Sequence, residues 1–202
     1  MYLTKSAIEK LLDNKQLIIR PLLDKQTQLG EVSLDLRLGQ DFLVSYLGRD
    51  VSIDATGETR NRPLHIFFDE TRRIVGEAFV FHPNQVVLCS TLEYIRLPDN
   101  VFMSLTTRSS YSRLGFSLST VVQPGYCGCI SIELTNTGNV PVKVLVGARL
   151  LQARFFKMES STKYLNTDRK YLCQVRPQVS KAPEDTEFKI LKSLVNTTPN
   201  LP

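Results

Sequence analysis

The strongest constraint on the fold is a series of short segments in which apolar and polar residues alternate. Residues 32–39, VSLDLRLG, alternate four apolar residues with polar residues and a glycine, which is typical of a strand buried on one face. Comparable short segments follow at residues 78–82, 85–90, 93–97, 102–107, 129–136, 141–146 and 150–156. Turn-forming Pro, Asn, Asp and Gly residues separate several of them. This spacing predicts a mainly β fold, either a barrel or a sandwich.

The two ends of the chain differ from this pattern. Near the start, Ser6 and Glu9 have the spacing of a capping box beside an apolar stripe, so a short N-terminal helix is expected. Residues 48–76 are polar and poorly periodic, which indicates an excursion from the β fold and not a second domain. We therefore predict one domain over residues 1–182 and a tail over 183–202, in which FKILKSL is expected to form a short helix.

Composition narrows the class of protein. The chain carries 25 Lys and Arg against 20 Asp and Glu, for a formal net charge of +5. This charge favours an anionic ligand, but the basic residues form no block of the kind that binds nucleic acid. No apolar run reaches membrane-spanning length, and the N-terminus lacks the apolar core of a signal peptide. We expect a cytoplasmic protein that binds neither nucleic acid nor membranes.

The four cysteines leave two interpretations open. Cys127 and Cys129 form a C-x-C pair, whose side chains would share one face of a strand. A metal ion held by this pair is one interpretation. Neither histidine lies at ligand spacing from the pair, and the other interpretation is packed, free thiols.

Residues 106–116, TTRSSYSRLGF, combine two arginines with five Ser and Thr side chains. Ser109 or Ser110 can cap a short helical turn, and Gly115 can end it. Backbone N–H groups at such a helix start attract anions, and arginine geometry suits phosphate oxygens. The stretch is therefore either a pocket for a phosphorylated ligand or a solvated surface turn.

Residues 123–138, QPGYCGCISIELTNTG, contain a carboxylate in the middle of an expected strand. Glu133 shares one face of that strand with Ser131, whereas its apolar neighbours face the opposite side. A carboxylate that is partly removed from water suits general acid–base catalysis. An exposed glutamate on the wet side of a sheet is the alternative.

Residues 163–181 are basic and carry two tyrosines, Tyr164 and Tyr171. One interpretation is a segment that folds over an anionic ligand, which makes residues 160–182 the closing segment of a site. The other interpretation is a charged loop without a binding role. The residues alone do not decide between the two.

Taken in order, four motifs resemble the dCTP deaminase family of the trimeric dUTPase superfamily. They are VSLDLRLG, RSSYSRLG, PGYCGCISIELTN and RKYLCQVRPQVSK, and together they extend over most of residues 1–182. The resemblance implies a distorted β-barrel of the jelly-roll, dUTPase-like type, with a short N-terminal helix and few other helices. It also implies a homotrimer with its active sites at the subunit interfaces.

The activity that the resemblance implies is the hydrolytic deamination of dCTP to dUTP and ammonia in pyrimidine deoxynucleotide metabolism. The implied partners are deoxycytidine and deoxyuridine nucleotides. Magnesium (Mg²⁺) is carried on the nucleotide triphosphate, and no zinc takes part. The sequence agrees with the last point, because the H-x-E…P-C-x-x-C signature of zinc deaminases is missing.

The resemblance also implies roles for individual residues. Glu133 matches the family's catalytic glutamate, a general base that takes a proton from the water attacking C4 of cytosine. Ser109 and Arg113 match the residues that hold and polarise that water or the base. The other implied nucleotide-binding residues are Arg108, Ser110, Gln123, Ser131, Ile132, Tyr164, Lys170 and Gln174. The last three belong to the segment that closes over the nucleotide.

Two departures from the family pattern keep other functions open. Gln123 stands where many members have an aspartate before Pro-Gly, and an amide cannot act as a carboxylate base. This disfavours one alternative, a dUTP diphosphatase or a bifunctional deaminase and diphosphatase. The link at residues 116–123 is shorter than in most members, which favours another alternative, a catalytically silent nucleotide-binding trimer.

Overall fold

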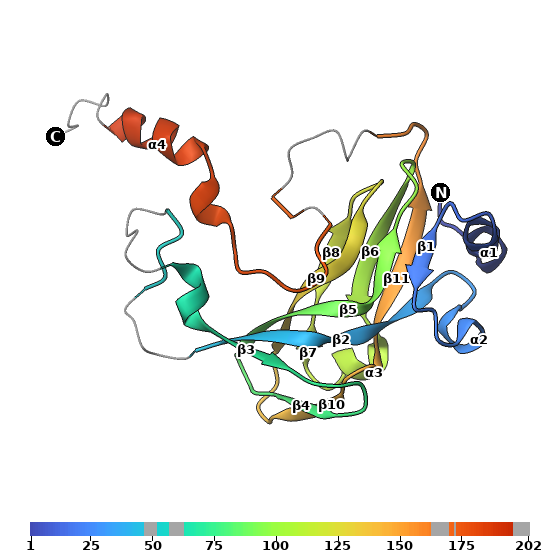
Figure 1. The fold of residues 1–202 in the computed structure, drawn as a ribbon, viewed down its shortest axis with the longest axis horizontal. Coiled ribbons are helices and arrows are strands. Elements are labelled where there is room, and N and C mark those ends of the chain that lie inside the picture. Colours follow the sequence, from blue (N-terminus) through green and yellow to red (C-terminus); the bar gives the residue numbers. More distant parts are fainter. Residues whose placement is uncertain (47–51, 57–62, 163–169, 172, 196–202) are drawn as a thin grey trace.

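Most of the expected strands form and pair in the computed structural model, which describes residues 1–46, 52–56, 63–162, 170–171 and 173–195. The helices are α1 (Lys5–Asp13), α2 (Lys25–Gln28), α3 (Ser109–Ser112) and α4 (Glu187–Val195), with 3₁₀ turns η1 (Leu64–Phe67) and η3 (Ala182–Glu184). The strands are β1 (Ile18–Arg20), β2 (Leu34–Ser45), β3 (Phe68–Arg72), β4 (Ala78–Phe81), β5 (Val86–Arg96), β6 (Val101–Thr107), β7 (Phe116–Ser117), β8 (Ser119–Val122), β9 (Cys127–Asn136), β10 (Val142–Leu145) and β11 (Arg149–Lys157). Figure 1 shows the strands curled into a barrel-like sheet, with α4 extending away from it.

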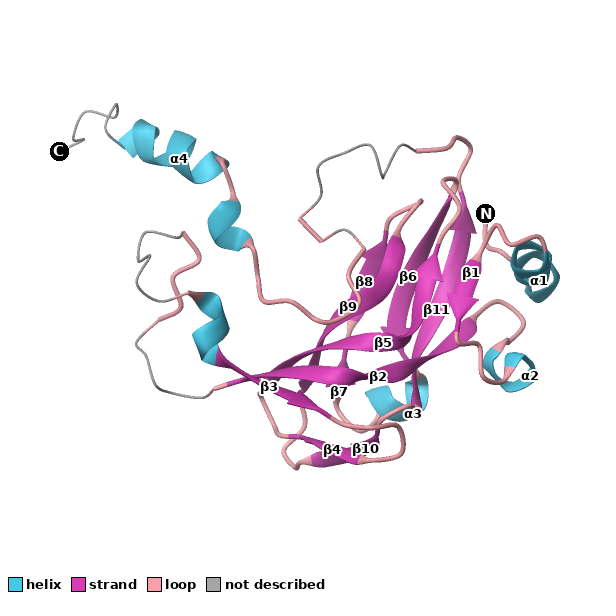
Figure 2. Cartoon of the chain, viewed as in Figure 1, coloured by secondary structure: helices cyan, strands magenta, loops and turns pink. Residues whose placement is uncertain are grey.

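A continuous antiparallel sheet forms the wall of the barrel. Its strands follow the order β7–β9–β5–β2–β11–β6–β8, with β1 added to β5 and β3 added to β2. β4 and β10 form a separate two-stranded sheet at one end of the barrel (Figure 2). Strands that are distant in sequence therefore face one interior, and the mainly β, barrel-type fold predicted for this chain is confirmed.

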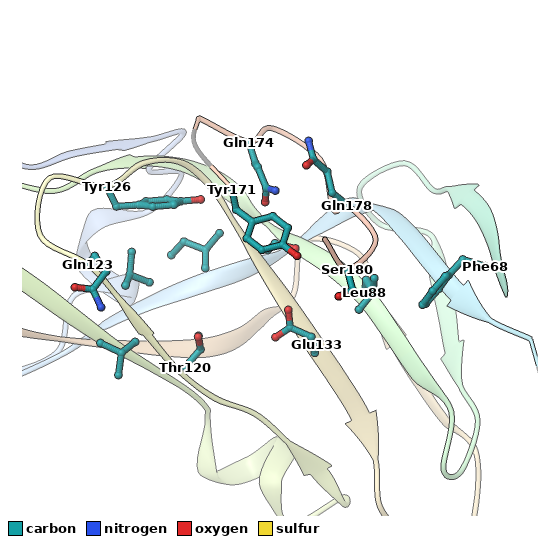
Figure 3. A pocket seen from close by; sticks show the side chains of 14 residues that line it. Phe68, Leu88, Thr120, Gln123, Tyr126, Glu133, Tyr171, Gln174, Gln178 and Ser180 are labelled. Carbon is teal, nitrogen blue, oxygen red and sulfur yellow. The ribbon is translucent and has the colours of Figure 1, made fainter. Parts of the chain in front are cut away.

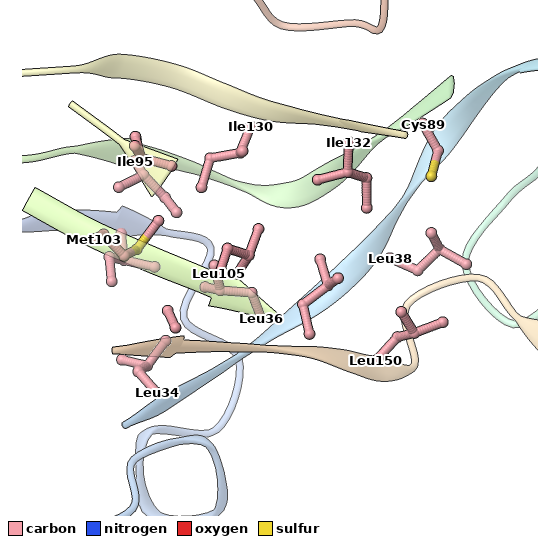
Figure 4. Packing of buried hydrophobic residues seen from close by; sticks show 14 of the residues in the cluster. Leu34, Leu36, Leu38, Cys89, Ile95, Met103, Leu105, Ile130, Ile132 and Leu150 are labelled. Carbon is pink, nitrogen blue, oxygen red and sulfur yellow. The ribbon is translucent and has the colours of Figure 1, made fainter. Parts of the chain in front are cut away.

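Alternation within the strands builds the core. Leu34, Leu36 and Leu38 are fully buried, whereas Val32, which precedes β2, is 45% exposed. Figure 4 shows these leucines facing the same interior as Ile132 of β9. Complete burial of a leucine side chain stabilises the fold by about 2 kcal/mol relative to exposure. In β9 the same alternation places Glu133 on the outer face, opposite the core.

β5 is a single strand where the sequence predicted two. Its register against β9 shifts between Ser90 and Tyr94, so the junction between the two predicted strands, at Thr91 and Leu92, is an irregularity within one strand. Glu93 in this irregularity is fully buried and accepts hydrogen bonds from Gln28 Nε2 (3.1 Å) and from the backbone N–H of Arg37 (2.9 Å). Burial raises the pKa of Glu93 to about 7.

The start of α1 differs from the prediction. The helix begins at Lys5, with Thr4 as its N-cap residue, so the predicted capping box of Ser6 and Glu9 is wrong. The backbone N–H of Lys5 donates to the carbonyl of Glu31 (2.7 Å). This tertiary contact starts the helix two residues earlier than the local motif indicates.

The polar region at residues 48–76 contributes more structure than its composition predicts. Within it the structure describes η1 and β3, and β3 pairs with β2 through residues 68–72. At the other end of the chain, the FKILKSL segment lies in α4, as expected. No helix in the described part of the chain is long and apolar enough to cross a membrane.

Candidate functional site

A cavity of about 440 Å³ opens between β8, β9 and the segment that begins at Lys170. Its lining is mainly apolar, with several amide, hydroxyl and carboxylate groups. The lining residues are Phe68, Leu88, Thr120, Val121, Val122, Gln123, Tyr126, Ile130, Ser131, Glu133, Tyr171, Gln174, Gln178 and Ser180. Figure 3 shows Tyr171 and Gln174 reaching from the C-terminal segment toward the strand that carries Glu133. A cavity of this kind, with a few converging polar groups, is typical of a small-molecule site.

Glu133 occupies the cavity wall because of its place in the alternation of β9. Ile132 and Leu134 on either side of it are fully buried in the core, so the carboxylate points outward. The side chain is exposed in the single chain, which matches the alternative of an exposed glutamate on the outer face of the sheet. The cavity therefore presents this carboxylate to an incoming ligand.

Gln174 provides a buried hydrogen-bond donor that has no partner. The residue is 5% exposed and lines the cavity, yet among the described residues its Nε2 has no hydrogen-bond partner. Leaving a buried donor unpaired costs about 1–3 kcal/mol. This atom therefore points to a ligand that supplies an acceptor when it occupies the cavity.

The backbone of Gln174 is fixed against β9. Its carbonyl accepts the N–H of Cys129 (2.7 Å). Gly128 adopts φ +140°, and a Cβ at that position would lie 2.6 Å from the same carbonyl. Only a glycine permits this close approach. Gly128 of β9 therefore allows the backbone of Gln174 to pack against the strand.

Two tyrosines that the sequence did not mark as binding residues also wall the cavity. The hydroxyl of Tyr126 donates to the carbonyl of Cys129 (2.7 Å), and the hydroxyl of Tyr171 accepts the backbone N–H of Lys181 (2.7 Å). These bonds fix both rings from their polar ends. The sequence signal that could have identified them is an aromatic residue directly after Pro-Gly and another directly after Lys170. Aromatic rings offer stacking surfaces to bases.

The short link at residues 116–123 still forms one side of the cavity. Its residues build β7 and β8, and β8 pairs with β6 from Met103 to Thr106. Residues 120–123, ending in Gln123, line the cavity. The reduced length therefore does not remove this wall.

The α3 turn is held by a cluster of buried or half-buried charges. Arg108 Nε lies 3.0 Å from Asp35 Oδ2, and Arg108 Nη1 donates to the carbonyl of Arg149 (3.0 Å). Burial raises the pKa of Asp35, while attraction to the guanidinium groups of Arg108 and Arg149 opposes that effect. Arg108 is also the N-cap residue of α3, so the prediction that Ser109 or Ser110 caps the turn is wrong. The reason is that the N–H of Arg108 bonds to the carbonyl of Leu150 (2.9 Å), which keeps Arg108 extended.

The exposed face of α3 carries the remaining residues predicted for this motif. Ser109, Ser110 and Arg113 are all exposed, and Arg113 makes no ion pair within the described residues. Gly115 ends the turn at φ +97°, as expected. None of residues 108–113 lines the cavity of Glu133. The single chain thus presents two separate groups of predicted site residues.

The other predicted binding residues have three different placements. Ser131 lines the cavity, whereas the side chain of Ile132 is buried in the core and only its backbone belongs to the site face of β9. Lys170 lies outside the lining; its Nζ pairs with Asp185 and donates to the carbonyl of Lys181. Tyr164 lies outside the described residues.

The described residues include no group of three or more His, Cys, Asp or Glu side chains placed to hold a metal ion. The C-x-C pair has a different contact. Cys127 lies 2.8 Å, sulfur to sulfur, from Cys173 of the C-terminal segment, and all four cysteines are free thiols. The interpretation of free thiols therefore fits the structure.

Comparison with known proteins points to one family. The profile of the dCTP deaminase-like family matches residues 2–158. A "dCTP deaminase, dUMP-forming" from Dictyoglomus turgidum is 35% identical over 187 residues, which cover 90% of this chain and 94% of that relative. A "dCTP deaminase" from Natronomonas pharaonis is 34% identical over 194 residues, which cover 93% of this chain and 98% of that relative.

A solved structure shares the fold. The crystal structure of 2'-deoxycytidine 5'-triphosphate deaminase from Agrobacterium tumefaciens matches with a TM-score of 0.58 and 24% sequence identity. The match covers 76% of this chain and 47% of that chain, so this chain spans about half the length of that structure. The likeness supports the barrel architecture.

Proposed function

This chain belongs to the dCTP deaminase-like family, and from that premise we propose that it removes the 4-amino group of dCTP by hydrolysis and releases ammonia. The observation that carries the proposal is the pairing of two groups in one cavity. Glu133 provides a carboxylate, and Gln174 provides a buried donor that has no partner among the described residues. A pyrimidine base offers acceptors at O2 and N3 and a reactive carbon at C4, so it complements both groups.

Glu133 is assigned the acid–base role. Its carboxylate takes a proton from the water that attacks C4 of cytosine, and then passes protons to the leaving amino group. Because Glu133 itself activates the water, the step is proposed without zinc. Mg²⁺ enters as part of the substrate, bound to the triphosphate.

The α3 turn is assigned to the phosphates and to the positioning of the attacking water. Ser109, Ser110 and Arg113 are exposed and available, and Arg108 anchors the turn through Asp35. These residues lie outside the cavity of their own chain, so we propose that a neighbouring subunit of a homotrimer completes each site. In this arrangement residues 1–182 act as one domain, and the segment around Gln174 closes the cavity.

The product is proposed to be dUTP. Gln123 lines the cavity and stands where many family members have an aspartate, and its amide cannot act as the carboxylate base that a diphosphatase reaction needs. A second candidate is a bifunctional reaction that ends in dUMP and pyrophosphate. The names of relatives such as the Dictyoglomus turgidum protein favour it.

One assay separates these functions. The purified protein is incubated with dCTP and Mg²⁺, and ammonia, dUTP, dUMP and pyrophosphate are measured over time. Ammonia and dUTP in equal amounts are expected. Formation of dUMP with pyrophosphate supports the bifunctional reaction. Thermal stabilisation by dCTP without ammonia release identifies a silent nucleotide-binding protein and contradicts the proposal.

A further inference from the structure

Two cysteines from distant parts of the chain meet beside the cavity. Cys127 begins β9, Cys173 lies 46 positions later in the C-terminal segment, and their sulfur atoms are 2.8 Å apart. A disulfide bond is about 2.05 Å long, so the two sulfurs need to move less than about 1 Å to become bonded. Nothing in the deamination proposed above uses either thiol.

Backbone contacts next to each cysteine hold the two sulfur atoms close together. The residue after Cys173 is Gln174, whose carbonyl accepts the N–H of Cys129 (2.7 Å). Gly128 leaves room for that carbonyl, as described above. Cys173 itself adopts φ +53°, a left-handed conformation that is uncommon outside glycine. Neighbouring contacts thus keep the backbone of Cys173 in the orientation that brings the two sulfurs together.

The two thiols differ in access. Cys173 is exposed, whereas Cys127 is 9% exposed and lies beneath it. An oxidant from solution reaches the outer thiol first, and the inner thiol is placed to react next. This is the arrangement of an attacking cysteine with a resolving cysteine.

We propose that Cys127 and Cys173 are a site of reversible oxidative modification, which converts the two thiols into one disulfide. The oxidant is a low-molecular-weight disulfide, RSSR. The thiolate of Cys173 attacks one sulfur of RSSR, forms a mixed disulfide and releases the first RS⁻. The thiolate of Cys127 then attacks the Cys173 sulfur, forms the protein disulfide and releases the second RS⁻. Two electrons pass from the protein to RSSR, and the two thiol protons are taken up as two molecules of RSH form.

The bond has a structural consequence for the cavity. It covalently attaches the segment that carries Gln174 to the strand that carries Glu133. With the disulfide in place, residue 173 cannot separate from β9 when the segment opens locally. Because the N–H of Cys129 bonds to the neighbouring Gln174 carbonyl, hydrogen exchange of the Cys129 amide should become slower. The link also closes a long loop in the unfolded chain, which raises the thermal stability.

The test uses the intact protein and oxidised glutathione at about pH 9.5, because the hydrogen bond to Cys127 raises the pKa of the Cys173 thiol and the thiolate is the reactive form. After oxidation, peptide mapping is expected to identify the Cys127–Cys173 disulfide. The melting temperature is expected to rise by about 5 °C, and hydrogen exchange at Cys129 is expected to slow by about tenfold. A reductant is expected to reverse all three changes.

Two variants make the result specific. Cys173→Ser is expected to abolish all three changes, while Cys129→Ser, which alters another thiol on the same strand, is expected to retain them. A stable mixed disulfide on Cys173, a link to a different cysteine, or a link between two chains would overturn the proposal. The readouts are covalent and thermal, so they hold or fail independently of any deaminase activity.

Discussion

The cavity that holds Glu133 and the α3 turn that holds Arg113 are fixed in the chain by different means. The α3 turn is anchored by charge, because Arg108 and Arg149 both approach a carboxylate, Asp35, whose side chain is 11% exposed. The cavity is open: Glu133 is exposed, and the buried Nε2 of Gln174 has no partner in the part of the chain that the structure describes. Contacts within the chain therefore hold the α3 turn in place, whereas the cavity keeps polar groups that a ligand can complete.

The separation of the two regions also has a consequence for assembly. Glu133 and Arg113 belong to one proposed reaction, yet residues 108–113 do not line the cavity of Glu133. In the homotrimer proposed above, a second chain brings its α3 turn to the cavity. In this proposal a single chain forms only part of each active site, and its cavity is therefore expected to be open.

The largest effect on activity is expected from removing the carboxylate of Glu133 in the open cavity. Glu133→Gln keeps the size of the side chain but cannot accept a proton, so the turnover of dCTP should fall by about a thousandfold. Binding of dCTP, measured by calorimetry, should change by less than about threefold. Glu70→Gln, at another exposed strand glutamate, is the matched control and should retain full turnover. A Glu133→Gln protein with the wild-type rate would exclude the assigned role.

Removing the carboxylate that anchors the α3 turn should lower the stability of the protein. Asp35→Asn leaves the guanidinium groups of Arg108 and Arg149 without their buried carboxylate, and urea unfolding should show a loss of about 3 kcal/mol. The comparison is Asp13→Asn, which removes a surface pair with Lys25 and should cost less than about 0.5 kcal/mol. Equal stabilities for the two variants would mean that α3 is not held by charge.

The buried acid beside the anchored region should make stability depend on pH. Glu93 has a folded-state pKa of about 7, above that of an unfolded glutamate, so its neutral form is favoured by folding. Its stabilising contribution is present at low pH and is lost as the pH rises through about 7. The free energy of unfolding should therefore fall by about 2 kcal/mol between pH 5 and 8, relative to Glu93→Gln. Parallel pH profiles for the two proteins would contradict this assignment.

The smallest effect is expected at the buried Nε2 of Gln174, which lacks a hydrogen-bond partner within the described residues. Gln174→Met keeps the length of the side chain and removes the buried donor, so the free protein should be as stable as wild type or slightly more stable. The affinity for dCTP should nevertheless weaken by about tenfold, because one hydrogen bond to the base is lost. Gln178→Met provides the comparison at another amide of the lining. A loss of stability without a loss of affinity would show that Gln174 serves the fold alone.

The sequence predicted the parts of this structure that depend on local pattern. The burial of Leu34, Leu36 and Leu38 follows from their alternation, and the placement of Glu133 on the opposite face of its own strand follows from the same rule. Gln174 was predicted as a binding residue from the family resemblance alone. No local sequence pattern indicates that its carbonyl packs against Gly128.

The parts that depend on contacts between distant residues could not be predicted. Asp35 anchors Arg108 across 73 positions of sequence, and its own strand pattern suggests only a polar residue on a wet face. The irregularity around Glu93 resembled a break between two strands because polar residues interrupt the alternation. Its burial depends on Gln28 and Arg37, which come from other elements.

The most direct test of a site shared between chains is complementation of two inactive variants. Glu133→Gln and Arg113→Ala proteins are each purified, mixed in equal amounts, dissociated and reassembled, and dCTP deamination is measured against each variant treated alone. If Glu133 of one chain works with Arg113 of its neighbour, about a quarter of all sites in the randomly reassembled sample contain both native residues, and activity should return to about a quarter of the wild-type rate. Mixed assemblies that form but remain as inactive as either variant would contradict a site built from two chains.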